Sequence, residues 1–192
     1  MWRTIRILLG IAFCMLGIFG CVYSIRVTKA QRLYYLVEYG DLTNAAPNVV
    51  ESTCAAAYDI YPHNFNVSAR AARTLWLRAF SSTVDDKASV IDQTEFWCDR
   101  GLIENPYSLS LKYRKAELIS LSSANDAADY WTEFVDWQFW SSQNLSILVK
   151  YYARAGRLVE AAEVLSLLKG HPDYKKSSMF LRKAWAAEMK FQ

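Results

Sequence analysis

The sequence has 192 residues, of which 53% are hydrophobic and 15% aromatic, and its formal net charge is +3. Its lysines and arginines are scattered among acidic residues, so no segment forms a phosphate-binding stripe and we do not expect nucleic acid as a partner. The length leaves room for one domain with a real core, or a short stack of repeats, but not for a second large domain.

The first element is an uncharged apolar run from Ile7 to Ile25. As an α-helix its 19 residues would reach about 28 Å, close to the thickness of the hydrocarbon core of a bilayer. We therefore expect a signal-anchor over residues 1–27 and a single-pass membrane protein. Basic residues flank the run on both sides, but a short basic N-terminus before an apolar run favours an extracytoplasmic, periplasmic domain over residues 28–192.

The segment from Ile18 to Cys21 has a second interpretation. It resembles the lipobox of bacterial lipoprotein signal peptides, in which a small residue precedes a cysteine that is acylated after cleavage. The resemblance implies a lipid on Cys21. Phe19 departs from the small or β-branched residue usual at its position, and the apolar run continues past the cleavage point to Ile25, which favours an uncleaved anchor. Both readings stay open at this point.

Helical signals continue after the apolar run. Residues Thr28 to Tyr39 extend the same helix, Gly40 ends it, and Pro47 fits the first turn of a helix that runs to Tyr61. A helix entered through Tyr61–Asn64 follows, and then a longer one from about Asp85 to Gly101. The adjacent acids Asp85 and Asp86 favour a helix N-terminus there over an acid/base pair.

An aromatic helix is predicted near residues 126–140. Most of its rings are expected to fill space against neighbouring helices. The sharper interpretation is that Trp137 and Trp140, at the helix end, form an exposed anchor for a partner or lie at a membrane surface.

The last third of the chain has the clearest helical period. Apolar residues recur from Leu145 to Tyr152 and from Leu158 to Leu168, with Gly156 between the two stripes and Gly170 after them. This pattern predicts an antiparallel helix pair with a glycine at each helix end. An amphipathic last helix around Leu181 to Met189 would cover the final apolar face.

The segment Tyr151 to Leu165 resembles the middle of a tetratricopeptide (TPR) repeat, with Tyr152, Gly156, Glu160-Ala161 and Pro172 at the family's positions. Pro172 comes one residue early, and weaker copies lie upstream. The resemblance implies an all-α chain in which the transmembrane helix is followed by a short TPR-like superhelix of antiparallel helix pairs. It also implies a concave groove lined by first-helix residues, which fall here on Ser146, Lys150, Ala153 and Arg154. Lys150 and Arg154, four residues apart, would grip a carboxylate of a bound peptide.

Residues for catalysis or metal binding do not form a recognised motif. His63 and His171 lie more than a hundred residues apart, no C-x-x-C spacing occurs, and phosphate-loop, dinucleotide, zinc-protease and hydrolase motifs are missing from the sequence. Cys54 and Cys98 are expected to be packing residues, with a disulfide possible in an oxidising compartment. We expect no cofactor.

These observations favour a non-enzymatic, membrane-anchored scaffold or adaptor that binds protein partners in cell-envelope assembly or polysaccharide-related complexes. One alternative is a lipoprotein acylated on Cys21 in an outer-membrane assembly complex. Another is an envelope enzyme, or a non-catalytic subunit of one, with its site built across helices.

Overall fold

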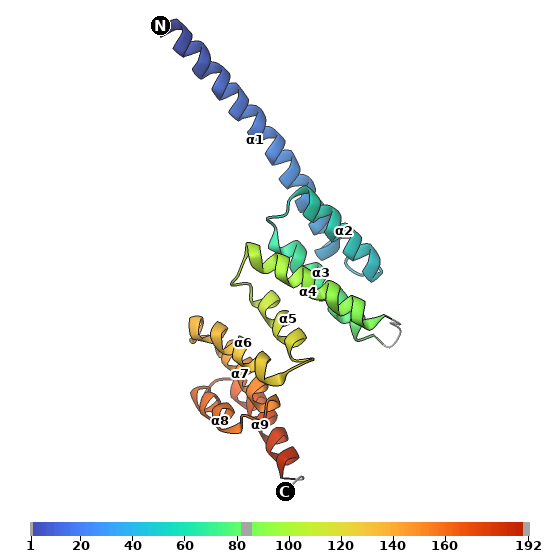
Figure 1. Cartoon of the computed structure of the whole chain (residues 1–192), viewed down its shortest axis with the longest axis vertical. Coiled ribbons are helices and arrows are strands. Elements are labelled where there is room, and N and C mark those ends of the chain that lie inside the picture. Colours follow the sequence, from blue (N-terminus) through green and yellow to red (C-terminus); the bar gives the residue numbers. More distant parts are fainter. Residues whose placement is uncertain (1, 82–85, 190–192) are drawn as a thin grey trace. The chain divides into compact units, whose positions relative to one another are not determined.

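The computed structural model describes residues 2–81 and 86–189, and these residues form nine α-helices and no β-strand (Figure 1). The all-helical class predicted from the sequence period is therefore confirmed. The helices group into two compact units, Met1–Pro106 and Tyr107–Gln192.

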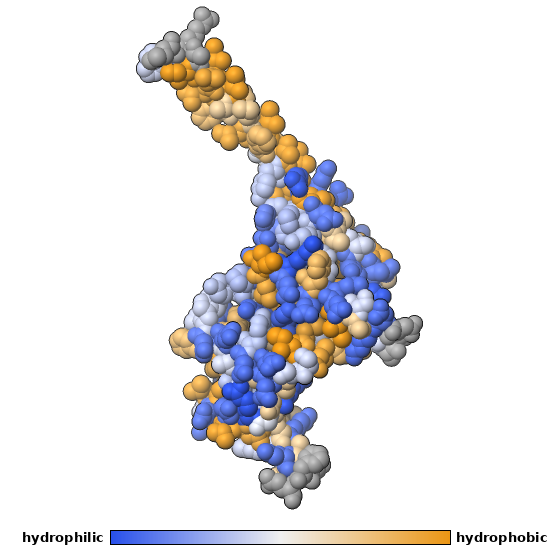
Figure 2. All heavy atoms as spheres, viewed as in Figure 1, coloured by the Kyte–Doolittle hydropathy of each residue, from blue (hydrophilic) through white to orange (hydrophobic). Residues whose placement is uncertain are grey.

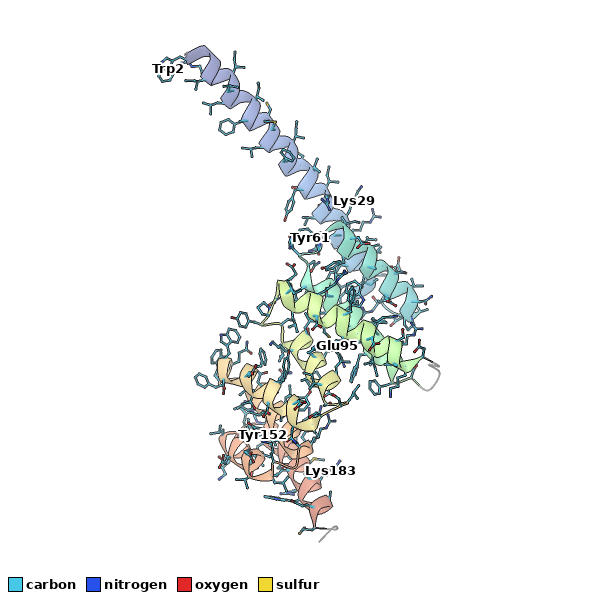
Figure 3. The ribbon with its side chains drawn as sticks, in the orientation of Figure 1. Trp2, Lys29, Tyr61, Glu95, Tyr152 and Lys183 are labelled. Atoms are coloured by element: carbon cyan, nitrogen blue, oxygen red, sulfur yellow. The ribbon has the colours of Figure 1, made fainter. Side chains whose placement is uncertain are left out.

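The first helix, α1 (Trp2–Glu38), is long and continuous. Its 37 residues correspond to about 56 Å. The most apolar window of the helix has a mean hydropathy of 2.3, and none of that window is buried against the described part of the chain. The hydrophobic surface of this stretch is visible in Figure 2, and Figure 3 shows its side chains projecting from the ribbon between Trp2 and Lys29. The helix is long and apolar enough to cross a membrane, and it continues without a break past residue 27.

Three more helices complete the first unit: α2 (Pro47–Ile60), α3 (Phe65–Ala79) and α4 (Lys87–Glu104). Pro47 occupies the first turn of α2, as the sequence predicted. The side chain of Asn64 caps α3 by accepting from the N–H of Asn66, and the side chain of Asp86 caps α4 by accepting from the N–H of Ser89. The N-terminal role predicted for Asp86 is confirmed, since it caps a helix that begins at Lys87, whereas Asp85 lies outside the described residues.

The core of the first unit lies where the C-terminal part of α1 packs on α2, α2 on α3, and α3 on α4. Small and β-branched residues dominate it, which lets the helices approach closely. The buried apolar residues are Ala30, Val37, Val50, Cys54, Ala57, Val67, Ala71, Ala72, Leu75, Ala79, Val90, Trp97 and Cys98.

The second unit contains α5 (Leu109–Ile119), α6 (Ala124–Trp137), α7 (Ser142–Arg154), α8 (Leu158–Leu167) and α9 (Asp173–Glu188). Consecutive helices pack on each other, and α9 also packs on α7. Gly156 (φ 73°) and Gly170 (φ 85°) adopt the left-handed conformation after α7 and α8. The predicted helix pair and its two glycine ends are therefore confirmed.

The end of α6 differs from the prediction. The aromatic helix is predicted to reach residue 140, but it ends at Trp137, because Gln138 leaves the helical conformation (φ −125°, ψ 45°). Ser141 then caps α7 by accepting from the N–H of Asn144. Trp140 consequently lies in the turn between two helices and not on a helix face.

Trp131 is the centre of the second core. Its ring is fully buried, and its indole N–H donates to the backbone carbonyl of Asn144 over 3.0 Å, which joins α6 to α7. Rings of Tyr113, Phe134 and Tyr151 lie around it. The other buried residues of this core are Ala116, Ala127, Ala128, Val135, Leu148, Val149, Tyr152, Leu158, Ala161, Leu165, Leu168 and Leu181.

Candidate partner-binding site

Four exposed aromatic residues gather at the turn between α6 and α7. We call Tyr107, Trp137, Phe139 and Trp140 the aromatic patch. Their exposed fractions are 54%, 46%, 67% and 68%. Soluble surfaces seldom leave several large rings exposed side by side, so the patch is a candidate interaction site.

The rings of the patch contact one another. Tyr107 stacks on Trp137 with 4.1 Å between ring centroids, and Trp140 lies 6.4 Å from Trp137 and 5.3 Å from Phe139. The ring of Trp137 also lies 6.5 Å from the buried Phe134. These contacts hold the exposed rings against a packed core, so a partner would meet a surface that loses little side-chain freedom on binding.

The second feature is a group of polar side chains on the facing sides of α5 and α7. Glu117 Oε1 accepts from Lys150 Nζ at 2.6 Å and from the hydroxyl of Tyr151 at 2.7 Å, and Arg154 Nη1 lies 3.5 Å away. Lys150 Nζ also donates to the hydroxyl of Tyr113 at 2.9 Å. We call these five residues the Glu117 cluster.

The electrostatics of this cluster favour the charged carboxylate. Burial would raise the pKa of Glu117, but hydrogen bonds from Lys150 and Tyr151, together with the charges of Lys150 and Arg154, outweigh burial and hold the pKa below its usual range. Burial and the neighbouring carboxylate raise the pKa of Tyr151, so its hydroxyl stays protonated as a donor. The cluster is an internally paired charge site.

The groove residues named from the TPR resemblance occupy different surroundings. Ser146 is buried where α9 packs on α7, and Ser177 on α9 donates to its hydroxyl over 2.8 Å. Ala153 is also buried, and the carboxylate that Lys150 meets is the chain's own Glu117. Arg154 keeps about half of its side chain exposed. The partner-binding role of these residues stays a prediction.

The cysteines divide into two pairs by burial. Cys54 and Cys98 are fully buried and no disulfide joins them, and desolvation raises the pKa of the Cys54 thiol to about 12. Cys21 is exposed on the apolar part of α1, and its lipidation stays a prediction. Within residues 2–81 and 86–189, no group of three or more metal-ligating side chains comes together.

Trp137 and Trp140 were predicted from the sequence, whereas Tyr107 and Phe139 were not. Phe139 lies between the two tryptophans in the chain, and the patch could have been completed had the helix been ended at the correct residue. Tyr107 precedes a helix 30 residues upstream of Trp137, and only the packing of α5 on α6 brings the two rings together.

Comparisons with protein-family models, curated proteins and solved structures found no match for this chain.

Proposed function

We propose that this protein is a membrane-anchored helical adaptor that binds a protein partner through the aromatic patch. The exposed ring cluster at the α6–α7 turn is the observation that carries the proposal. The apolar part of α1 supplies the anchor, and the partner lies in or near the same membrane.

The patch supports this function energetically. A large aromatic side chain has roughly 150–250 Å² of surface, so covering the exposed two-thirds of Trp140 or Phe139 removes on the order of 130 Å² each from water. At ~25 cal/mol per Å², each ring contributes about 3 kcal/mol, which is the range of interface hot spots. Two such rings suit a partner of moderate affinity.

Anchoring makes moderate affinity sufficient. A chain held by α1 meets membrane partners at a raised effective concentration, so contacts that would be weak in solution can still assemble a complex. We place the helical units on the extracytoplasmic side, as the short basic N-terminus favours. A role in cell-envelope assembly or polysaccharide-related complexes fits such a scaffold.

A TPR-like arrangement is part of the proposal. The pair α7–α8 with its left-handed Gly156, and α9 lying against both members, support the stacking expected of a helical repeat with a capping helix. In such an array the exposed guanidinium of Arg154 is the side chain left to meet an acidic partner residue.

Site-specific photo-crosslinking tests the patch. We would replace Phe139 with a photoreactive phenylalanine analogue in full-length chain produced in its own cells, and use Val159 on α8, 70% exposed, as the matched control position. We expect a discrete protein adduct from position 139 and none of that size from position 159.

Three outcomes would reject the adaptor role of the patch. No protein adduct from position 139 would do so, and so would an equal adduct from position 159. Crosslinks to lipid alone would identify the rings as a membrane-surface contact instead.

A further inference from the structure

A cleft of about 440 Å³ lies in the first unit, beside the loop that joins α1 to α2. Three arginines of α3 line it, namely Arg70, Arg73 and Arg78, and we call it the arginine cleft. Its size is that of a small-molecule site. No residue of the aromatic patch or the Glu117 cluster takes part in it.

The helical period of α3 explains why the arginines meet. Positions 70, 73, 74, 77 and 78 follow the i, i+3, i+4, i+7, i+8 spacing, so they share one face of the helix. The opposite face carries the buried residues Ala71, Ala72 and Leu75. The arginine face thus looks away from the α3–α4 core.

The charged side chains that line the cleft are all arginines. Arg70 is held in place, since its Nη2 donates to the carbonyl of Thr43 at 2.9 Å and its Nε lies 3.5 Å from a carboxylate oxygen of Glu38. That buried Nε has no hydrogen-bond acceptor among the residues that the structure describes. Within the described residues Arg73 and Arg78 have no ion pair, and no acidic side chain lines the cleft.

The start of α2 adds to the excess of positive charge. Ala45 and Pro47 line the cleft at the start of α2, a helix N-terminus that no side chain caps, so its dipole adds positive potential.

Val50 and Leu77, the latter 62% exposed, give the cleft an apolar wall. Measured along α1, Glu38 lies about 20 Å beyond Ile25, so the ligand comes from solution and not from a bilayer.

We infer that the arginine cleft binds a small organic anion, whose phosphate or carboxylate group lies between Arg73 and Arg78 and whose apolar part packs on Leu77 and Val50. Guanidinium groups bind both kinds of oxyanion with paired hydrogen bonds. Arg70, which Thr43 and Glu38 hold in place, lines the same cleft and adds a third guanidinium group. This site is independent of the adaptor function proposed above.

Calorimetric titration of the full-length chain in lipid nanodiscs tests the inference. The probes are phenyl phosphate and phenylacetate, with neutral benzyl alcohol as the uncharged control and empty nanodiscs as the blank. We expect saturable binding of at least one anionic probe and none of benzyl alcohol. Phenyl phosphate alone would identify a phosphate site, and phenylacetate alone a carboxylate site.

Two sets of variants locate the binding. Substituting Arg73→Gln with Arg78→Gln should weaken the bound probe at least about 30-fold, whereas Arg182→Gln, an exposed arginine on α9, should leave it unchanged. Leu77→Glu places a carboxylate at the exposed wall and should abolish binding without touching an arginine. Helicity measured by circular dichroism checks that each variant is folded.

The inference is overturned if neither anionic probe binds the wild-type chain, or if benzyl alcohol binds as well as they do. Unchanged binding by the folded Arg73→Gln, Arg78→Gln double variant or by folded Leu77→Glu would overturn it equally. None of these results bears on crosslinking at Phe139, so failure of the anion site and failure of the adaptor function are distinguishable.

Discussion

Replacing Glu117 with glutamine should loosen the second unit. The substitution keeps the shape of the side chain but removes the negative charge that pairs with Lys150 and Arg154 and that strengthens the hydrogen bond from Tyr151. Lys150 exposes only 13% of its side chain and Glu117 14%, so the stranded ammonium cannot be fully rehydrated. Breaking a fully buried pair costs about 3 to 5 kcal/mol, and the remaining exposure reduces this to about 2 to 3 kcal/mol.

Hydrogen exchange followed by mass spectrometry is the assay, because it measures the opening free energy of α5 and α7 peptides separately from the rest of the chain. A loss of about 2 to 3 kcal/mol corresponds to exchange about 30- to 150-fold faster in these peptides. Glu133→Gln, which removes an exposed carboxylate from α6, is the matched control and should change exchange little.

A double variant separates charge from packing. Adding Lys150→Met to Glu117→Gln removes the stranded ammonium. The double variant should therefore lose less stability than the two single variants lose in sum. The reasoning is refuted if Glu117→Gln exchanges like the Glu133→Gln control, or if the two losses are simply additive.

Four further outcomes follow from the same contacts. Because the folded pKa of Glu117 is lowered, its contribution to stability is fully present above the ordinary value of 4.5 and is lost as pH falls through the folded value. An acid titration of helicity should show this, and equal acid sensitivity in Glu117→Gln would contradict it. Gly156→Ala should cost about 1 kcal/mol, because its φ of 73° strains a side chain although the surrounding space is open. A neutral or stabilising result in thermal unfolding would show that the turn relaxes. Trp131→Phe should cost about 2 to 3 kcal/mol, since it opens a cavity and leaves the carbonyl of Asn144 without its donor. Denaturant unfolding measures the loss, and a change below about 1 kcal/mol would remove that bond from the account. Cys54, buried and with its pKa raised to about 12, should react with iodoacetamide only after unfolding, and rapid labelling of the native chain would show that its site is open.

Most helices, and the helix ends marked by a proline or glycine, were predictable because their signals are local. Gly156 and Pro47 determine backbone conformation through their own chemistry, and apolar residues at helical spacing identify the buried side of α7 and α8. The continuous α1 follows from an uninterrupted run of helix-compatible residues past the apolar segment. The end of α6 was missed because Gln138, which forms the turn, has no strong turn preference.

The site depended on long-range contacts that spacing does not contain. Ser146 looked like a groove residue until α9 covered it with Ser177, and the carboxylate partner of Lys150 comes from 33 residues upstream. The arginines of α3 are different. Their spacing was readable in the sequence, but charges at helical spacing usually belong to a solvated face. Only the fold shows that Arg73 has no acidic partner in the described part of the chain.

The proposed function depends most on α1 holding the chain in a membrane. The most direct measurement is the intact mass of the chain recovered from membranes after alkaline washing. We predict that the washed membranes retain the chain and that its mass includes the segment from Ile7 to Ile25. A chain that lacks this segment and is recovered in the wash would contradict the account. A lipid-modified chain that begins at Cys21 and stays in the membranes would contradict it as well.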